Sequence, residues 1–305
     1  MLKTPILFLI FNRPEETKRV FEEIKKQKPQ RLYVAADGAR AHKQGEAELC
    51  AQTRAVINNI DWDCEVKTLF REENLGCKKA VSEGINWFFD NVEEGIILED
   101  DCLPSNSFFR FCEENLEKYR HDNRIMHISG ENPLDMEFGD ASYYFSKIPH
   151  IWGWASWRRA WALYDAEFQN FDYFIENNII QNIFEQKEAQ KYWNKILMRV
   201  KNGEINTWDY QWTYNLFVNN GLSIVPNKNM VSNIGFGHAE AAHTSENASC
   251  ANRQVHEINE IIHPEFIIPQ KQAVNEILKV RYDIHKKTVP FIIKREISRT
   301  LKKFK

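Results

Sequence analysis

The first hundred residues consist of short apolar runs separated by longer amphipathic segments. Short apolar runs bounded by polar or turn-forming residues are typical of strands that are buried on both faces. The segments between them repeat apolar residues every three or four positions, which is the spacing of one helix face. The expected strands are residues 5–11, 31–37, 65–70 and 96–98.

Three helices are expected between these strands. The first begins at Pro14, a residue favoured in a first helical turn, and buries Val20, Phe21 and Ile24. The second covers residues 46–59. The third has an apolar face made of Ala80, Val81, Ile85, Phe88 and Phe89. Alternation of strands and helices predicts an α/β fold with a mostly parallel sheet and helices on both faces.

The second half of the chain is richer in aromatic residues. Four of the nine tryptophans lie between residues 152 and 161. Trp154, Trp157 and Trp161 are spaced as on one face of a helix, so the pattern predicts a helix that buries them. Further strands are expected at residues 124–129, 142–146 and 222–225.

Polar residues follow the expected strands where each one ends. These strand-end residues are Asn12 and Arg13, Asp37 and Gly38, Arg71 and Glu72, and Glu99 to Asp101. Ligands of such sheets bind at the carboxyl ends of the strands, so we expect these residues to cluster around a nucleotide. Asp37 would accept hydrogen bonds from a base or ribose, and Gly38 would allow close approach. Lys78 and Lys79 open the third helix, whose backbone N–H groups could hold a diphosphate.

The three consecutive carboxylates Glu99, Asp100 and Asp101 are the feature around which the chain is organised. Adjacent carboxylates repel one another unless a cation or hydrogen-bond donors neutralise them. The arrangement therefore indicates a hard metal ion, Mn²⁺ or Mg²⁺, bound together with a phosphate ligand. The alternative is a solvated acidic turn before a helix that begins near Ser107.

Two aromatic segments provide candidates for the acceptor side. Trp152 precedes Gly153, and an indole ring stacks well on the apolar face of a sugar. Asp209 lies between Trp208 and Trp212 at the start of an expected helix. Partial desolvation would make Asp209 a general base, and capping of the helix is the alternative role.

A glycine-rich loop after the last expected strand carries His238, Glu240 and His243. Either histidine could reach a metal ion or a phosphate, and Glu240 is a rival to Asp209 as the base. The chain lacks G-x-G-x-x-G and G-x-x-x-x-G-K-[ST], which argues against dinucleotide enzymes and P-loop NTPases. No nucleic-acid partner is expected.

Composition suits one compact body. The 305 residues are 43% hydrophobic, and the six cysteines form no Cys-x-x-Cys pair, which favours a reducing cytoplasm. We expect a catalytic domain over residues 1–270, with a nucleotide-sugar half at 1–130 and an acceptor half at 131–270. A basic helical tail is expected over residues 271–305.

The tail has a distinct charge. Residues 286–305 carry a net charge of +7, whereas the rest of the chain carries −10. Ile293, Ile297 and Leu301 lie four positions apart among lysines and arginines, as in a helix on an anionic membrane surface. A solvated basic terminus is the alternative. The apolar run at residues 5–11 is too short to span a membrane, so the expected location is cytoplasmic, with peripheral contact to the inner face of the plasma membrane.

Together these segments resemble the GT-A glycosyltransferases. The resemblance covers about residues 5–245 and is carried by Asn12-Arg13, Asp37-Gly38, Leu98 to Asp101, Trp152 to Trp154, and Asp209 between aromatics. Within that group the chain is most similar to inverting, metal-dependent N-acetylglucosaminyltransferases with a Glu-Asp-Asp motif and to related bacterial sugar transferases.

The resemblance implies a role for each matching residue. Asp101 would be the metal ligand, with His243 as a further metal contact, and Asp209 would be the base. The nucleotide sugar would be held by Phe11, Asn12, Arg13, Asp37, Gly38, Lys79, Glu99 and Asp100. Trp152, Gly153 and Trp208 would form a platform for the sugar or the acceptor.

The expected function is transfer of a sugar from a UDP-sugar, UDP-GlcNAc being the donor that the resemblance favours, to a glycan or lipid-linked acceptor, with inversion. A retaining transferase on the same fold is the nearest alternative. A non-catalytic, membrane-peripheral nucleotide-binding protein is the alternative from a different class. Metal-dependent turnover of a sugar nucleotide would exclude the latter.

Overall fold

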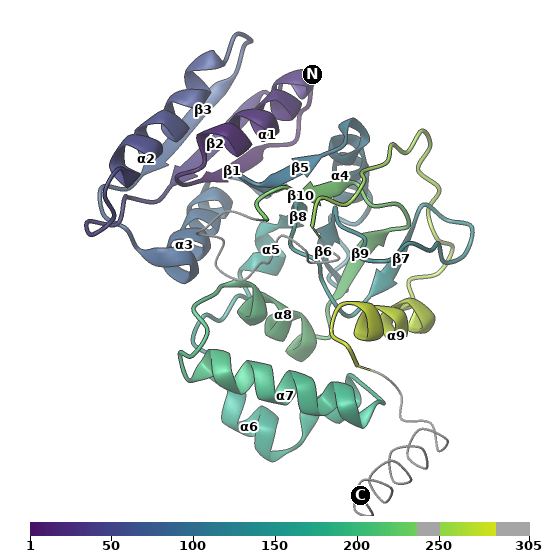
Figure 1. Ribbon diagram of the computed structural model, residues 1–305. Helices are drawn as coiled ribbons and strands as arrows, with labels where there is room; N and C mark the ends of the chain where they lie inside the picture. The colour runs from purple at the N-terminus through teal and green to yellow at the C-terminus, as the bar shows by residue number, and fades with distance from the viewer. Residues whose placement is uncertain (237–250, 285–305) are drawn as a thin grey trace, which may run out of the picture.

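The computed structural model describes residues 1–236 and 251–284. An eight-stranded sheet lies at the centre of the molecule, with helices around it (Figure 1). The strand order is β3-β2-β1-β4-β8-β6-β9-β7. In chain order through the first half, the elements are β1 (Ile6–Ile10), α1 (Pro14–Gln27), β2 (Arg31–Ala36), α2 (Glu46–Ala55), the 3₁₀ helix η1 (Val56–Asn59), β3 (Glu65–Phe70), α3 (Gly76–Asn91) and β4 (Glu94–Glu99).

The second half continues the same sheet. Its elements are β5 (Cys102–Pro104), α4 (Asn106–Lys118), β6 (Ile125–Ser129), β7 (Tyr143–Ser146), β8 (Trp154–Trp157), α5 (Arg158–Trp161), α6 (Phe171–Glu176), η2 (Ile179–Asn182), α7 (Lys187–Lys201), α8 (Asp209–Val218), β9 (Leu222–Pro226), β10 (Val231–Asn233) and α9 (Lys271–Val280). Strands β5 and β10 form a separate two-stranded sheet. One sheet thus spans both predicted halves, and the boundary at residue 130 stays a prediction.

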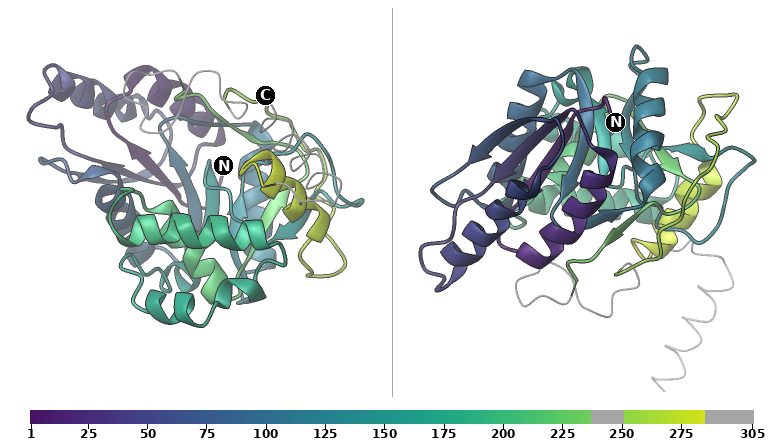
Figure 2. Two further views of the ribbon diagram at one scale, coloured as in Figure 1. Left: turned by 60° about the horizontal axis from the view of Figure 1, so that its bottom comes forward. Right: turned by 90° about the horizontal axis from the view of Figure 1, so that it is seen from above.

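The predicted class, an α/β fold with a mostly parallel sheet between helices, is confirmed. Strands β3, β2, β1 and β4 pair in parallel, as do β6 and β9, while β8 and β7 run antiparallel to their neighbours. Helices α1 and α4 pack on one face of the sheet, and α3 and α8 pack on the other (Figure 2).

The helix predicted over the tryptophan-rich stretch is wrong for residues 154–157, although residues 158–161 form the short helix α5 and the three tryptophans are buried as expected. Residues 154–157 form strand β8, which lies between β4 and β6 and pairs with both. Trp154 and Trp157 are buried on opposite faces of the sheet, in different core clusters. Because a central strand is buried on both faces, it shows no polar alternation, and the helical spacing of its tryptophans was coincidental.

The start of the segment predicted as a tail packs on the body. Helix α9 buries Ala273, Ile277 and Leu278 in a core cluster shared with α6 and α7. The amphipathic repeat from Ile293 onward lies outside the described residues. In the part of the chain that the structure describes, no helix combines the length and apolar character needed to cross a bilayer.

Candidate active site

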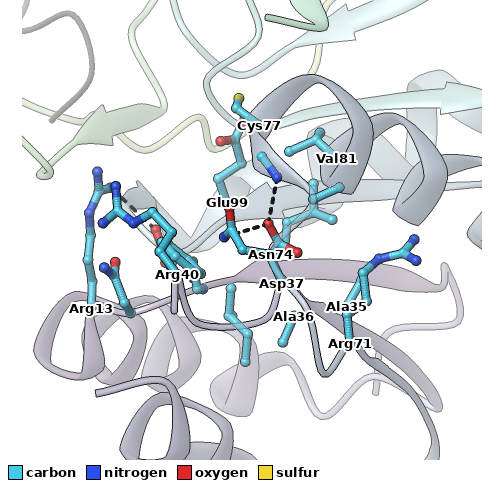
Figure 3. A pocket seen from close by; sticks show the side chains of 17 residues that line it. Arg13, Ala35, Ala36, Asp37, Arg40, Arg71, Asn74, Cys77, Val81 and Glu99 are labelled. Atoms are coloured by element: carbon cyan, nitrogen blue, oxygen red, sulfur yellow. Dashed lines mark hydrogen bonds and ion pairs between the residues drawn. The ribbon is translucent and has the colours of Figure 1, made fainter. Parts of the chain in front are cut away.

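A cavity of about 280 Å³ opens at the carboxyl ends of β1, β2 and β4, beside the N-terminus of α3 (Figure 3). This is the edge at which the strand-end residues were expected to gather. Side chains around it include Phe11, Asn12, Arg13, Asp37, Arg40, Arg71, Asn74, Cys77, Val81, Glu99 and Asp100. The cavity therefore gathers most of the expected strand-end residues, and Arg40 and Cys77 also line it, whereas Gly38, Glu72 and Asp101 do not.

The acidic segment reaches this site because of the sheet register. Glu99, the last residue of β4, pairs with Leu9 of β1, so the next two carboxylates lie beside the end of β1. Asp100 accepts a hydrogen bond from the backbone N–H of Phe11 at 3.0 Å. Arg13 donates to Asp101 at 2.5 Å and lies 3.4 Å from Asp100. The segment is therefore held by β1 and is not a freely solvated turn.

Glu99 projects into the site from the end of β4. Among the described residues, its carboxylate makes no hydrogen bond or ion pair, and it points toward Cys77 and the cavity (Figure 3). Burial, followed by the charges of Asp101, Asp100 and Asp209, raises the pKa of Glu99 to about 8. Burial likewise raises the pKa of Asp100 to about 7, against the opposing charge of Arg13. Both carboxyl groups therefore hold a proton more readily than usual, as expected where buried carboxylates crowd together.

Asp209 does not line the cavity, but it comes from a distant part of the chain to lie near two residues that do, Glu99 and Cys77. It is the first residue of α8, and the hydroxyl of Thr207 donates to its carboxylate. Burial raises its pKa, and the Thr207 hydrogen bond works in the opposite direction. Because its charge acts on both Glu99 and Cys77, Asp209 lies within electrostatic reach of the cavity.

Asp37 has a different role from the predicted one. Its carboxylate accepts hydrogen bonds from the backbone N–H groups of Gly38, Leu75 and Gly76 and from the side chain of Asn74. Asp37 therefore holds the loop that leads into α3, which leaves it little capacity for a base or ribose. The close approach at Gly38 is by the backbone of Glu73, which a Cβ at position 38 would overlap.

The N-terminus of α3 is also largely engaged by the protein. Besides Gly76, Lys78 donates its backbone N–H to the side chain of Asn206 at 3.3 Å. The backbone N–H groups of Gly76 and Lys78, at the helix terminus expected to hold a diphosphate, therefore already have acceptors within the protein. Lys79 is exposed, lies 3.8 Å from Glu83 and does not line the cavity.

On the cavity wall formed by the residues after β1, hydrogen bonds and ring contacts hold Phe11 and Asn12, two residues predicted to contact the nucleotide sugar. Asn12 donates to Glu46 at 2.9 Å, and the guanidinium of Arg40 pairs with the same carboxylate and lies 5.6 Å from the Phe11 ring. The Arg40 hydrogen bonds hold the pKa of Glu46 below its ordinary value. Neither Arg40 nor Glu46 was singled out from the sequence as a site residue; Arg40 lies in the loop after β2, and Glu46 is the first residue of α2.

Cys77 was also missed from the sequence. Desolvation, with the charge of Glu99 as the next cause, raises the pKa of this thiol to about 12. The group is therefore neutral and forms an uncharged wall of the cavity. Its position directly after Gly76, at the start of a helix that faces the strand ends, is the signal that could have identified it.

The predicted sugar platform is only partly accessible. Trp208 is wrong as a platform residue, because it is 2% exposed and stacks on Trp154 at 5.6 Å. Trp152 is half-buried, with the edge of Phe236 on one side and the guanidinium of Arg281 4.4 Å from its ring centre. Gly153 has a φ of 61° and packs against Val231. Trp152 and Gly153 stay predictions.

The residues described by the structure do not by themselves form a closed metal site. Within residues 1–236 and 251–284, no three His, Cys, Asp or Glu side chains are arranged to hold one ion. His238, Glu240 and His243 lie outside the described residues. A metal ion that is delivered with a nucleotide needs only one or two protein carboxylates, because phosphates and water complete its shell. Glu99 and Asp101 supply carboxylate oxygens of the kind that such an ion binds.

Comparisons with known proteins find only remote likenesses to solved structures. No family model and no curated protein matches the chain. The solved structures that it resembles include an apo UDP-glucose pyrophosphorylase (TM-score 0.40, 11% identity, 76% of this chain and 93% of that one). HddC from Yersinia pseudotuberculosis (0.32, 12%, 51% and 77%) and 4-diphosphocytidyl-2C-methyl-D-erythritol synthase from Anaerococcus prevotii (0.33, 8%, 52% and 74%) also match.

Proposed function

We propose that this protein is a glycosyltransferase that uses a nucleotide diphosphate sugar as its donor. One observation supports this most: Glu99 and Asp100 line a cavity at the strand ends, and the charges of Asp101 and of Asp209, which comes from a distant segment, act on Glu99. The cavity has polar and apolar walls suited to a nucleoside. The charged rim suits a diphosphate only when a cation accompanies it.

The donor set favours Mg²⁺ or Mn²⁺, since both prefer carboxylate oxygens. Asp101 would hold the ion, with Glu99 as a second oxygen ligand. When bound, the ion stabilises the negative charge of the leaving nucleoside diphosphate. Arg13 lies next to Asp101 and is the residue best placed to contact the diphosphate directly.

Asp209 is the proposed general base. Burial raises its affinity for a proton, and Thr207 holds its carboxylate in one orientation. It comes from the acceptor half, on a segment separate from the metal-binding carboxylates, as an inverting displacement requires. The proposed acceptor is a hydroxyl of a glycan or a lipid-linked saccharide, and the proposed donor is UDP-linked, with UDP-GlcNAc first.

A screen of sugar nucleotides for slow metal-dependent hydrolysis tests the proposal. We expect one donor to be turned over with Mn²⁺ or Mg²⁺ and not after chelation. Asp101→Ala should abolish metal-dependent binding of UDP in calorimetry while preserving the circular dichroism spectrum. Absence of turnover with every donor would favour a non-catalytic nucleotide-binding protein, and the anomeric configuration of the product separates inversion from retention.

A further inference from the structure

Arg13 and Asp101 form a close ion pair at the point where the metal ion is expected. Nη1 of Arg13 lies 2.5 Å from Oδ2 of Asp101 and 3.4 Å from Oδ1 of Asp100. The side chains of Arg13 and Asp101 are only 22% and 15% exposed. A guanidinium this close to a carboxylate occupies one of the positions that a metal ion would need.

Arg13 also balances the charge of its surroundings. Glu99, Asp100 and Asp101 are consecutive, and Asp209 adds to the charge around Glu99. The positive charge of Arg13 acts on both Glu99 and Asp100 and opposes the repulsion between them. Without a cation at this position, the carboxylates would be left mutually repelling in a poorly solvated place.

The backbone after β10 closes over the same pair. Ile234 donates its N–H to the backbone carbonyl of Asp101 at 2.8 Å. A Cβ at Gly235 would overlap Oδ2 of Asp101 and lie 2.9 Å from Nη1 of Arg13. The pair is therefore packed in place by a second segment, so a metal ion that binds Oδ2 of Asp101 must displace Arg13.

We infer that Arg13 is a built-in counter-ion that occupies the cation position at Asp101 until a nucleotide diphosphate arrives. This inference rests on the proposed function. The diphosphate offers Arg13 a stronger anionic partner, so Arg13 moves to it and exposes Asp101 to the metal ion. Metal and nucleotide then bind as a pair, and neither binds well alone. A free metal ion, without a bound nucleotide sugar, therefore occupies the site only weakly.

Titration of the protein with Mn²⁺ tests the role of Arg13 without enzyme turnover. Electron paramagnetic resonance measures the concentration of free Mn²⁺ at each step. Arg13→Gln removes the charge but keeps a donor for Asp101, whereas Arg13→Lys keeps the charge. Without nucleotide, we expect Arg13→Gln to bind Mn²⁺ about tenfold more tightly than the wild type, a typical size for coupling between two sites. Arg13→Lys should stay close to the wild type. Arg120→Gln, which alters an arginine paired with Glu94 at the opposite end of β4, is the matched control and should not change Mn²⁺ affinity.

The same titration with UDP separates the two proposals. Wild-type protein should bind Mn²⁺ more tightly when UDP is present, and this gain should shrink in Arg13→Gln. If Mn²⁺ affinity without nucleotide is unchanged or lower in Arg13→Gln, Arg13 is not the counter-ion. If UDP leaves the wild-type affinity for Mn²⁺ unchanged, the proposed function fails. The comparison of the wild type with Arg13→Gln in the absence of UDP still tests whether Arg13 is the counter-ion of Asp101. Should Arg13→Gln fold poorly, Arg13→Met provides the same charge removal.

Discussion

The carboxylate of Asp37, at the end of β2, accepts a hydrogen bond at 2.9 Å from the backbone N–H of Leu75, the residue that precedes α3. The two residues are far apart in sequence, and their contact fixes where α3 begins relative to the sheet. Because α3 forms one wall of the cavity, Asp37 determines the shape of the site although it was expected to bind the ligand itself.

Asp37→Ala should therefore act on stability first. It leaves the N–H groups of Leu75 and Gly76 and the amide of Asn74 without their acceptor, at a cost of about 2 kcal/mol or more in the free energy of unfolding. Urea denaturation measures this, and Asp37→Asn, which keeps one acceptor oxygen, should lose less. A variant with normal stability but weakened nucleotide binding would instead support the ligand role.

Asp209→Asn tests the base. The amide keeps the shape of the side chain and can still bond to Thr207, so stability and donor affinity should change little. Loss of a general base should lower kcat by roughly 10²-fold or more. Steady-state kinetics with saturating donor and acceptor measure it. Near-normal turnover would move the search to Glu240.

Trp208→Ala and Trp152→Ala should behave differently. Trp208 is buried against Trp154 and Trp161, so its truncation leaves a cavity and should cost about 3–5 kcal/mol of unfolding free energy. Trp152 is half-buried, so its truncation should cost less and, if it contacts sugar, should raise KM for the acceptor. Thermal unfolding and acceptor kinetics of the two variants distinguish these roles.

Stability should fall in acid because of His127. Its Nδ1 accepts from the indole N–H of Trp212 at 3.1 Å, and its Nε2 donates to the carbonyl of His150 at 2.9 Å, so the buried ring is bonded in its neutral form. Burial lowers the pKa of His127 to about 4, below its ordinary value of 6.5. The unfolded chain binds the proton first, so the unfolding free energy should decrease as pH falls from about 6.5 to 4.

Urea denaturation at several pH values across this interval checks the prediction. His127→Asn removes the titrating group, and its stability should depend less steeply on pH, although the neighbouring His150 retains a contribution, since burial lowers its pKa as well. An identical slope in the variant and the wild type would assign the acid sensitivity to other groups.

Because residues 286–305 carry a net charge of +7, we expect the protein to bind anionic membranes through them. The full chain should sediment with liposomes that contain anionic lipid, whereas a version that ends at Val289 should stay in the supernatant. The reason is that each Lys or Arg near the membrane surface contributes on the order of 1 kcal/mol to binding. Helix α9 is intact in the shorter version, so its fold should be unchanged. Equal binding of both versions, or binding that persists with neutral lipid alone, would refute a role for the tail charge.

The sequence by itself determined the order of strands and helices in the first half and the edge of the sheet at which polar residues gather. Both follow from the local pattern of apolar and polar residues. This pattern predicts a strand at residues 96–98 and a helix after Pro14, and the structure has the same element at each place. The acidic segment was evident because three adjacent carboxylates are costly wherever they occur.

Only the tertiary structure decided what these residues contact. Trp154 and Trp157 belong to a strand because β4 and β6 flank them, and no local pattern records which strands become neighbours. Asp37 and Gly38 serve the loop before α3, and Trp208 fills the core, because packing between distant segments uses the same polar and aromatic groups that a ligand would use. The approach of Asp209 to Glu99 likewise depends on how α8 lies against the sheet, which is a long-range property of the chain.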